Sequence, residues 1–284
     1  MINGWQILLT ISIATYAISV LLQKTLLKEP DSDPIAFCIV FQILTGLTLG
    51  GYVFIRGVTI PNLIPFIPNI VLPILLYGVG NALIFQALKR IDASEFTIIF
   101  SSRVFFTIAS AILFLKEPFS SVQFIGTMFI ILSIVLISWE KKSFSFHSGY
   151  VLAIFAAICY GMEFVNDAYV ITKINVSFYF ALVLFAQGLF IGAVYRRPLM
   201  KIKTVFRVKT LARLIVFILL YAIQAVTIFE AYKVGKNAAQ IASINQTTTI
   251  MTVILAVVFL KERKNLLRKI VGVCISSIGV LLVI

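Results

Sequence analysis

The chain consists almost entirely of apolar runs, each about as long as a lipid bilayer is thick. A helix needs roughly 20 apolar residues to cross the hydrocarbon core, and ten such runs lie along the 284 residues. Because lipid offers the backbone no hydrogen-bond partners, each run is predicted to be a helix. The predicted spans are residues 5–27, 35–55, 69–88, 94–115, 119–138, 149–171, 175–195, 211–232, 238–260 and 266–284.

The composition excludes an ordinary soluble domain. Hydrophobic residues make up 61% of the chain and charged residues only 12%, whereas a soluble domain has about 25% charged residues. The first span has no basic segment before it and no evident cleavage site, so we expect it to be retained rather than removed as a signal peptide. We therefore predict an all-α, polytopic membrane protein, located in a bacterial or archaeal inner membrane.

The two halves of the chain carry the same motifs. The pattern A-x-x-F-L-K-E at 111–117 returns at 256–262, and F-x-A-x-K at 85–89 returns at 229–233. Tyr16 and Tyr160 fit the same offset of 144. We predict two repeats, residues 1–143 and 144–284, with five helices each. An odd number of spans gives the two repeats opposite orientations, related by a pseudo-two-fold axis in the membrane plane.

The basic residues are unequally shared between the two sides of the predicted bundle. The odd-numbered connections and their span ends carry 18 Lys and Arg, and the even-numbered ones carry five. The positive-inside rule places the basic side in the cytoplasm and both termini outside. The net charge of +13 is thus explained by membrane insertion, and no nucleic-acid partner is expected.

Equivalent spans of the two halves contain the same small-residue pair. Gly46 and Gly50 lie four residues apart in the second span, and Gly188 and Gly192 do so in the seventh. Small residues at this spacing let helices pack closely in lipid. We expect a role in packing within the chain, with a homodimer seam as the weaker alternative; the protein is predicted to be a monomer or a weak homodimer.

Several spans carry polar residues, which are expensive in hydrocarbon and are candidate functional residues by default. Tyr160, Glu163 and Asp167 are spaced i, i+3, i+7 and so lie on one helical face. Such faces are expected to line a shared, water-accessible cavity. The candidate site residues are Tyr16, Arg103, Tyr160, Glu163, Asn166, Asp167, Gln224, Glu230, Asn245 and Gln246.

Ten spans, two repeats and an acidic residue after the fourth and ninth spans resemble the EamA-type branch of the drug/metabolite transporter superfamily. The matching motifs are L-K-E-P at 115–118 and L-K-E-R at 260–263. The resemblance implies export or exchange of small metabolites, such as amino acids or nucleobases, through a central cavity. It also implies cytoplasmic termini, against the charge count. Members often have a proline where this chain has Arg103 and Thr248, so their substrates do not carry over.

The charged residues suggest roles in a cavity of this kind. Arg103 offers a planar fork for a carboxylate or phosphate, and alternatively it pairs with Glu163 or Glu230 and joins helices. Glu163 could bind an ammonium group or carry a coupling proton. The hypothesis is a secondary transporter of an amino acid or similar zwitterion, coupled to its own gradient, a counter-substrate or protons. Glu117 and Glu262 are expected to cap or tether short connections.

Other classes of function fit the sequence less well. Nucleobases, nucleosides and cationic drug-like compounds are the alternative substrates. A polytopic membrane enzyme would need a catalytic motif, and the only histidine, His147, lies in a predicted loop. A receptor or scaffold would need neither an inverted repeat nor polar residues within spans. The isolated cysteines Cys38, Cys159 and Cys274 have no metal-binding spacing, so no metal or cofactor is expected.

Overall fold

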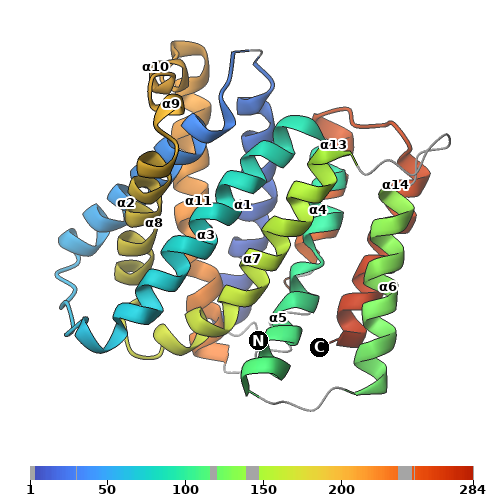
Figure 1. Cartoon of the computed structure of the whole chain (residues 1–284), viewed down its shortest axis with the longest axis horizontal. Helices are drawn as coiled ribbons and strands as arrows, with labels where there is room; N and C mark the ends of the chain where they lie inside the picture. Colours follow the sequence, from blue (N-terminus) through green and yellow to red (C-terminus); the bar gives the residue numbers. More distant parts are fainter. Residues whose placement is uncertain are drawn as a thin grey trace.

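Every regular element in the described part of the chain is a helix. The computed structural model describes residues 4–29, 31–115, 120–138, 147–235, 245 and 247–283 (Figure 1). The helices are α1 (Gly4–Leu27), α2 (Pro34–Ile55), η1 (Ile64–Phe66), α3 (Ile67–Arg90), α4 (Ala93–Phe100), α5 (Arg103–Leu115), α6 (Ser121–Ser138), α7 (Ser148–Val170), α8 (Val176–Val194), α9 (Arg196–Leu199), α10 (Ile202–Val205), α11 (Val208–Gly235), α13 (Thr247–Phe259) and α14 (Leu266–Val283). The predicted all-α class is confirmed.

Six helical segments are long and apolar enough to cross a membrane on their own. They are Gly4–Leu27, Pro34–Ile55, Ile64–Arg90, Ser148–Val170, Val176–Val194 and Thr210–Val234. The chain is therefore an integral, multi-pass membrane protein. The total of ten spans stays a prediction, because part of the predicted ninth span lies outside the described residues.

The prediction of one continuous helix over residues 94–115 was wrong. This segment forms α4 and α5, with a turn at Ser101 and Ser102 between them. The Ser101 hydroxyl donates to the Ile98 carbonyl at 2.6 Å and also lies 2.5 Å from the Ser276 hydroxyl of α14. Serine side chains that bond to nearby backbone compete with regular helical hydrogen bonds. The interruption makes Arg103 the first residue of α5.

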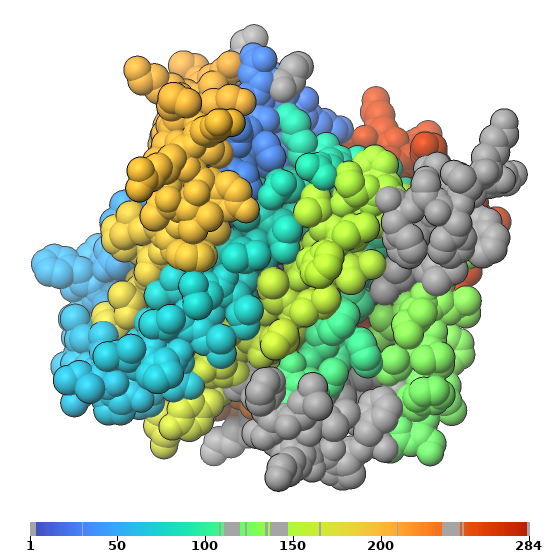
Figure 2. All heavy atoms as spheres, viewed as in Figure 1, coloured from blue at the N-terminus to red at the C-terminus, as the bar shows by residue number. Residues whose placement is uncertain are grey.

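Helices from the two halves pack against each other in symmetric pairs. The second spans of the halves, α2 and α8, pack together, as do the fifth spans, α6 and α14. The contact of α1 with α11 is matched by that of α7 with α3, and Figure 2 shows α3 and α7 as neighbouring bands across one face. Figure 1 shows α1 and α7 running in opposite directions, as inverted repeats require.

The connections rich in basic residues gather at one end of the bundle. The short helices α9 and α10 and the turns after α1, α3 and α13 all lie at the upper end in Figure 1, and both termini lie toward the lower end. The structure thus separates a basic end from the end that holds the termini. Which end faces the cytoplasm stays a prediction.

Glycines allow α2 and α8 to approach closely. A Cβ atom on Gly46 would lie 2.6 Å from the Phe185 backbone nitrogen, and one on Gly188 would lie 2.5 Å from the Ile43 side chain. Gly50 has nothing within 4 Å of such an atom. The predicted role in packing within the chain is confirmed for Gly46 and Gly188, which leave no room for a side chain.

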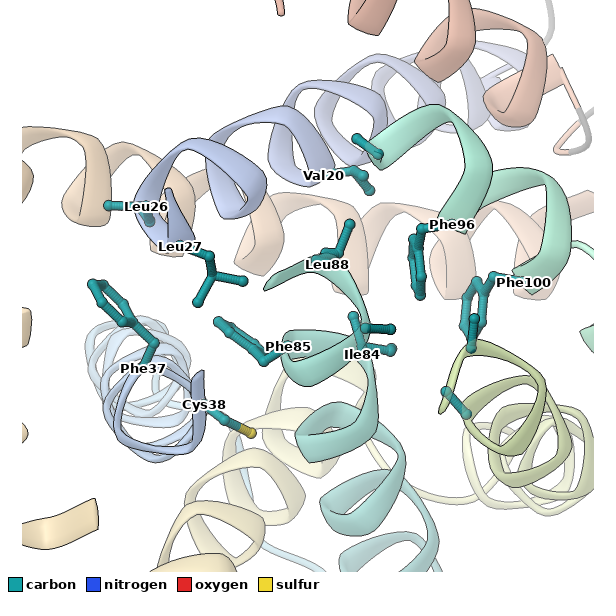
Figure 3. Close-up of a cluster of buried hydrophobic side chains, with 14 of the residues drawn as sticks. Val20, Leu26, Leu27, Phe37, Cys38, Ile84, Phe85, Leu88, Phe96 and Phe100 are labelled. Atoms are coloured by element: carbon teal, nitrogen blue, oxygen red, sulfur yellow. The ribbon is translucent and has the colours of Figure 1, made fainter. Parts of the chain in front are cut away.

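The main apolar core lies where the first four helices meet. Figure 3 shows side chains of α1, α2, α3 and α4 pointing toward one another. The labelled residues are Val20, Leu26, Leu27, Phe37, Cys38, Ile84, Phe85, Leu88, Phe96 and Phe100. In lipid such packing holds helices together mainly through dispersion and shape, and here it holds α4 against α1 and α3.

Glu262 ties the connection between α13 and α14 to the start of α4. Its carboxylate accepts hydrogen bonds from the backbone N–H groups of Ala93 and Ser94, each at 3.0 Å, and from the Ser94 hydroxyl at 2.7 Å. The buried ammonium group of Lys269 lies 4.0 Å from Glu262 and 2.7 Å from Asp92. The capping role expected for Glu262 is confirmed; Glu117 lies outside the described residues.

Candidate functional site

A cavity of about 160 Å³ lies between the two halves of the chain. It is lined by aromatic, amide and aliphatic side chains and by one charged residue. The described lining residues are Tyr16, Tyr77, Asn81, Arg103, Val104, Thr107, Tyr160, Phe164, Phe180, Leu184, Gln187, Tyr221, Gln224, Ala225, Ile228, Phe229, Tyr232 and Asn245. The volume is large enough for several waters or a small organic molecule.

Tyrosines at equivalent positions of the two repeats face this cavity. Tyr16 and Tyr160 are separated by the repeat offset of 144, and so are Tyr77 and Tyr221. The rings of Tyr77 and Tyr160 lie 4.5 Å apart between centroids. Because both members of each pair line the cavity, the two halves of the chain contribute matching residues to it.

Arg103 carries the only charge among the described residues that line the cavity. Its guanidinium group lies over the ring of Phe100, 4.9 Å from the centroid, and over the ring of Tyr16, 5.7 Å from the centroid. Cation–π contacts of this kind hold an arginine in place. The Tyr16 hydroxyl is also a hydrogen-bond partner of the guanidinium group, whose five N–H donors leave others for a ligand. The alternative in which Arg103 pairs with Glu163 or Glu230 is absent: among the described residues no carboxylate lies within 4.0 Å of it.

A chain of amide groups crosses the interface behind the tyrosines. Gln42 donates to the Gln187 side-chain oxygen at 3.1 Å, and Gln187 donates to the Pro73 carbonyl at 3.2 Å. The Tyr160 hydroxyl donates to the Asn81 side-chain oxygen at 2.7 Å. Sequence reasoning missed these amides. Gln42 and Gln187 lie in the equivalent second and seventh spans, 145 residues apart and so within one residue of the repeat offset, and comparing the two spans could have revealed them.

The structure separates the predicted site residues into two groups. Five line the cavity, namely Tyr16, Arg103, Tyr160, Gln224 and Asn245. Four others do not, namely Glu163, Asn166, Asp167 and Glu230. Gln246 lies outside the described residues.

The face of α7 that carries Tyr160, Glu163 and Asp167 is directed mainly at neighbouring helices. Asp167 accepts hydrogen bonds at 2.6 Å from the hydroxyls of Tyr77 and Tyr179, on α3 and α8. The side chains of Glu163 and Asp167 are fully buried, and of the three residues only Tyr160 lines the cavity. Arg103 and Glu163 are therefore not arranged as two ends of one binding site, because α7 directs its carboxyl groups into the contacts with α3 and α8.

The described residues do not form a metal-binding site. No group of three or more His, Cys, Asp and Glu side chains comes together within this part of the chain. Cys38 is buried, Cys159 is half-buried and Cys274 is exposed, and all three are free thiols. The chemistry offered by the cavity is therefore that of aromatic faces, amides, hydroxyls and one guanidinium group.

Comparison with known proteins supports the membrane architecture. One crystal structure of another protein aligns with a TM-score of 0.58 over 99% of this chain and 97% of that chain, at 14% sequence identity, which shows a shared fold. No curated protein matches the sequence. A sequence model of the EamA-like transporter family matches twice, over residues 3–139 and 147–284. The chain belongs to the EamA-like transporter family, within the drug/metabolite transporter superfamily.

Proposed function

We propose that this transporter carries a small metabolite with a single carboxylate and an apolar or aromatic body across the membrane. The observation that carries this proposal is Arg103, the one charged residue among the described residues lining the cavity. A guanidinium group binds a carboxylate through two parallel hydrogen bonds. A carboxylate on the substrate would therefore supply the anionic partner that Arg103 lacks within the described part of the protein.

The rest of the cavity wall suits the remainder of such a molecule. Tyrosine and phenylalanine side chains from both halves provide flat apolar faces. The side-chain oxygens of Asn81, Gln187, Gln224 and Asn245 could accept hydrogen bonds from an amine. Amino acids thus stay within the proposed class, with amides and tyrosine faces in place of Glu163 as the partners of the ammonium group.

The alternative substrates fit the cavity less well. A cationic drug-like compound would be repelled by Arg103, since no carboxylate among the described lining residues offsets this charge. An uncharged nucleobase could stack on the tyrosines but would leave the guanidinium group without an anion. Charge complementarity therefore favours an anionic or zwitterionic substrate.

The proposed mechanism is alternating access. Inverted repeats that enclose a site let the two halves rock about it, so that the site opens to one side and then to the other. The cavity lies between the halves, and residues of both repeats line it. The substrate gradient or an exchanged ion would supply the driving force. The boundary between the repeats at residues 143 and 144 is part of this proposal.

Three related ligands test the charge requirement. L-phenylalanine, 3-phenylpropionate and phenethylamine share one aromatic body but carry both charges, only the carboxylate or only the amine. We expect the first two to raise the melting temperature of the purified protein, because a bound ligand stabilises the folded state, and phenethylamine to leave it unchanged. Stabilisation by phenethylamine alone would contradict the proposal.

Two arginine variants make the test specific. Arg103→Ala should weaken binding of 3-phenylpropionate by about 10- to 100-fold, since hydrogen bonds to charged groups contribute about 1.5–3 kcal/mol. Arg56→Ala is the matched control, because Arg56 also lies over a tyrosine ring, 5.6 Å from the Tyr52 centroid, but is not one of the residues that line the cavity. Equal affinities of wild type and Arg103→Ala would overturn the assignment.

A further inference from the structure

A second polar cluster lies where α3, α7 and α8 meet, beside the cavity. We call it the carboxyl cluster; its members are Asn69, Tyr77, Glu163, Asn166, Asp167 and Tyr179. Tyr77 and Tyr179 donate to the two oxygens of Asp167, each at 2.6 Å. The Asn166 amide donates to Glu163 and to the Asn69 carbonyl. The cluster thus joins two buried carboxyl groups to tyrosine hydroxyls and amides.

The two carboxyl groups have no positive partner among the described residues. Glu163 and Asp167 are both 0% exposed, and no lysine, arginine or histidine there lies within 4.0 Å of either. They lie one helical turn apart on α7, so two negative charges would also repel each other. Burying one unpaired carboxylate is already expensive, and burying two neighbouring ones is more so.

Charged groups on the surrounding helices do not offset the cost of burying these two carboxyl groups. Arg90 of α3 bonds to Ser148 at the first turn of α7, at the opposite end of that helix. Glu95 of α4 lies beside Tyr150 at the same end. Arg103 of α5 lies on the Phe100 and Tyr16 rings. Among the described residues, the titratable groups that face Glu163 are therefore Tyr77, Tyr179 and Asp167.

The hydrogen bonds distinguish the two acids. Both oxygens of Asp167 accept from a hydroxyl group, which is the arrangement that a carboxylate prefers. Glu163 accepts one hydrogen bond from Asn166 on Oε1, while its buried Oε2 has no partner. A charged oxygen without a donor is unfavourable, whereas a protonated one only lacks an acceptor. The proton of the pair is thus best placed on Glu163.

We propose that Glu163 holds an exchangeable proton and that the carboxyl cluster is the coupling-proton site of this transporter. Tyr77 both lines the cavity and donates to Asp167, so one hydroxyl connects the cluster to the substrate site. A proton needs only one oxygen, and the unpartnered Oε2 atom of Glu163 provides it. The coupling role rests on the proposed transport function; the presence of the proton does not.

Infrared spectroscopy of the full chain in lipid nanodiscs tests the proton directly. A buried, protonated glutamic acid gives a carboxylic C=O stretching band at neutral pH. We expect this band in the wild type and in Glu230→Gln, whose carboxyl group lies in neither the cavity lining nor the cluster. The band should be missing from Glu163→Gln. Its absence from the wild type, or its persistence in Glu163→Gln, would overturn the proton site.

Uptake into proteoliposomes tests the coupling, with labelled L-phenylalanine as the probe. For one proton moved per substrate, a gradient of one pH unit raises accumulation by up to about tenfold. We expect a response of this kind in the wild type and in Glu230→Gln, and none in Glu163→Gln. Substrate exchange without any response to pH in the wild type would overturn the coupling but not the transport. An infrared band without any uptake would instead contradict the proposed function, and a sodium-driven response would overturn the choice of ion.

Discussion

Two buried glutamates of this chain lie in opposite electrostatic surroundings. Glu262, 7% exposed, accepts three hydrogen bonds from the start of α4 and lies 4.0 Å from the ammonium group of Lys269. Glu163, 0% exposed, accepts one hydrogen bond, has one unpartnered oxygen and has no cation nearby among the described residues. The same side chain thus meets three donors and a cation at one site, and one donor and no cation among the described residues at the other.

The contrast arises from which donors neighbouring segments provide. The first backbone N–H groups of α4 have no partner within their own helix, and they lie at its positive end. Both features favour a carboxylate. The middle of α7 has no free backbone donors, because its N–H groups are used within the helix. A carboxyl group there depends on side chains alone, and α3 and α8 direct theirs at Asp167 rather than at Glu163.

The largest effect is expected from removing the Glu262 side chain. Glu262→Ala leaves the Ala93 and Ser94 N–H groups without acceptors and takes one anion from the buried Lys269. Breaking a buried ion pair in this way should lower the free energy of unfolding by about 3 kcal/mol, measured by denaturation in mixed micelles. Lys264→Ala, an exposed neighbour, is the control and should be unaffected. Equal stability of both variants would show that the hydrogen bonds and the ion pair of Glu262 do not stabilise the fold.

Removing one hydroxyl from the carboxyl cluster should have the next largest effect. Tyr179→Phe leaves one oxygen of Asp167 without its donor, which should lower the free energy of unfolding by about 2 kcal/mol. Tyr169→Phe changes an exposed tyrosine and serves as the control. An unchanged melting temperature for Tyr179→Phe would indicate that Asp167 carries no charge, and the proton would then have to be placed on Asp167.

A smaller effect is expected from trimming the cap of α4. Ser94→Ala removes the hydroxyl donor to Glu262 and keeps both backbone donors. The loss of one hydrogen bond should lower the free energy of unfolding by about 1 kcal/mol. Ser148→Ala removes an exposed hydroxyl whose hydrogen bond from Arg90 lies in solvent, and it provides the baseline in the same assay. A loss as large as that of Glu262→Ala would show that the hydroxyl, rather than the helix end, holds the carboxylate.

The smallest effect, and the sharpest contrast, is expected from neutral replacements of the two glutamates. Glu163→Gln has nearly the shape of a protonated glutamate, so the free energy of unfolding should change by no more than about 0.5 kcal/mol at neutral pH. Glu262→Gln should be clearly destabilised, since it replaces an acceptor oxygen by a donor that faces the α4 N–H groups. The comparison fails if the two variants lose similar stability.

The internal repeat allowed part of the candidate site to be predicted from the sequence. It identified Tyr16 and Tyr160 as an equivalent pair, and both line the cavity. It passed over Tyr77 and Tyr221, which have the same offset, because a tyrosine in an apolar span can equally face lipid or protein. Arg103 was found because an arginine within a span is rarely tolerated against lipid. The direction of Glu163 was not predictable, since it depends on how α7 is rotated against α3.

The apolar runs by themselves determined that this chain is helical and membrane-embedded, and the repeated motifs determined that it is duplicated. Lipid leaves the backbone no hydrogen-bond partner outside a helix, so length and composition are sufficient for that conclusion. Only the tertiary structure decided that the fourth span is interrupted at Ser101 and Ser102, and that Arg103 faces the cavity while Glu163 faces Asn166. These features depend on hydrogen bonds and helix rotations that are set by residues distant in sequence. An apolar span can pack on any of its sides, so its own sequence does not determine which side faces the cavity.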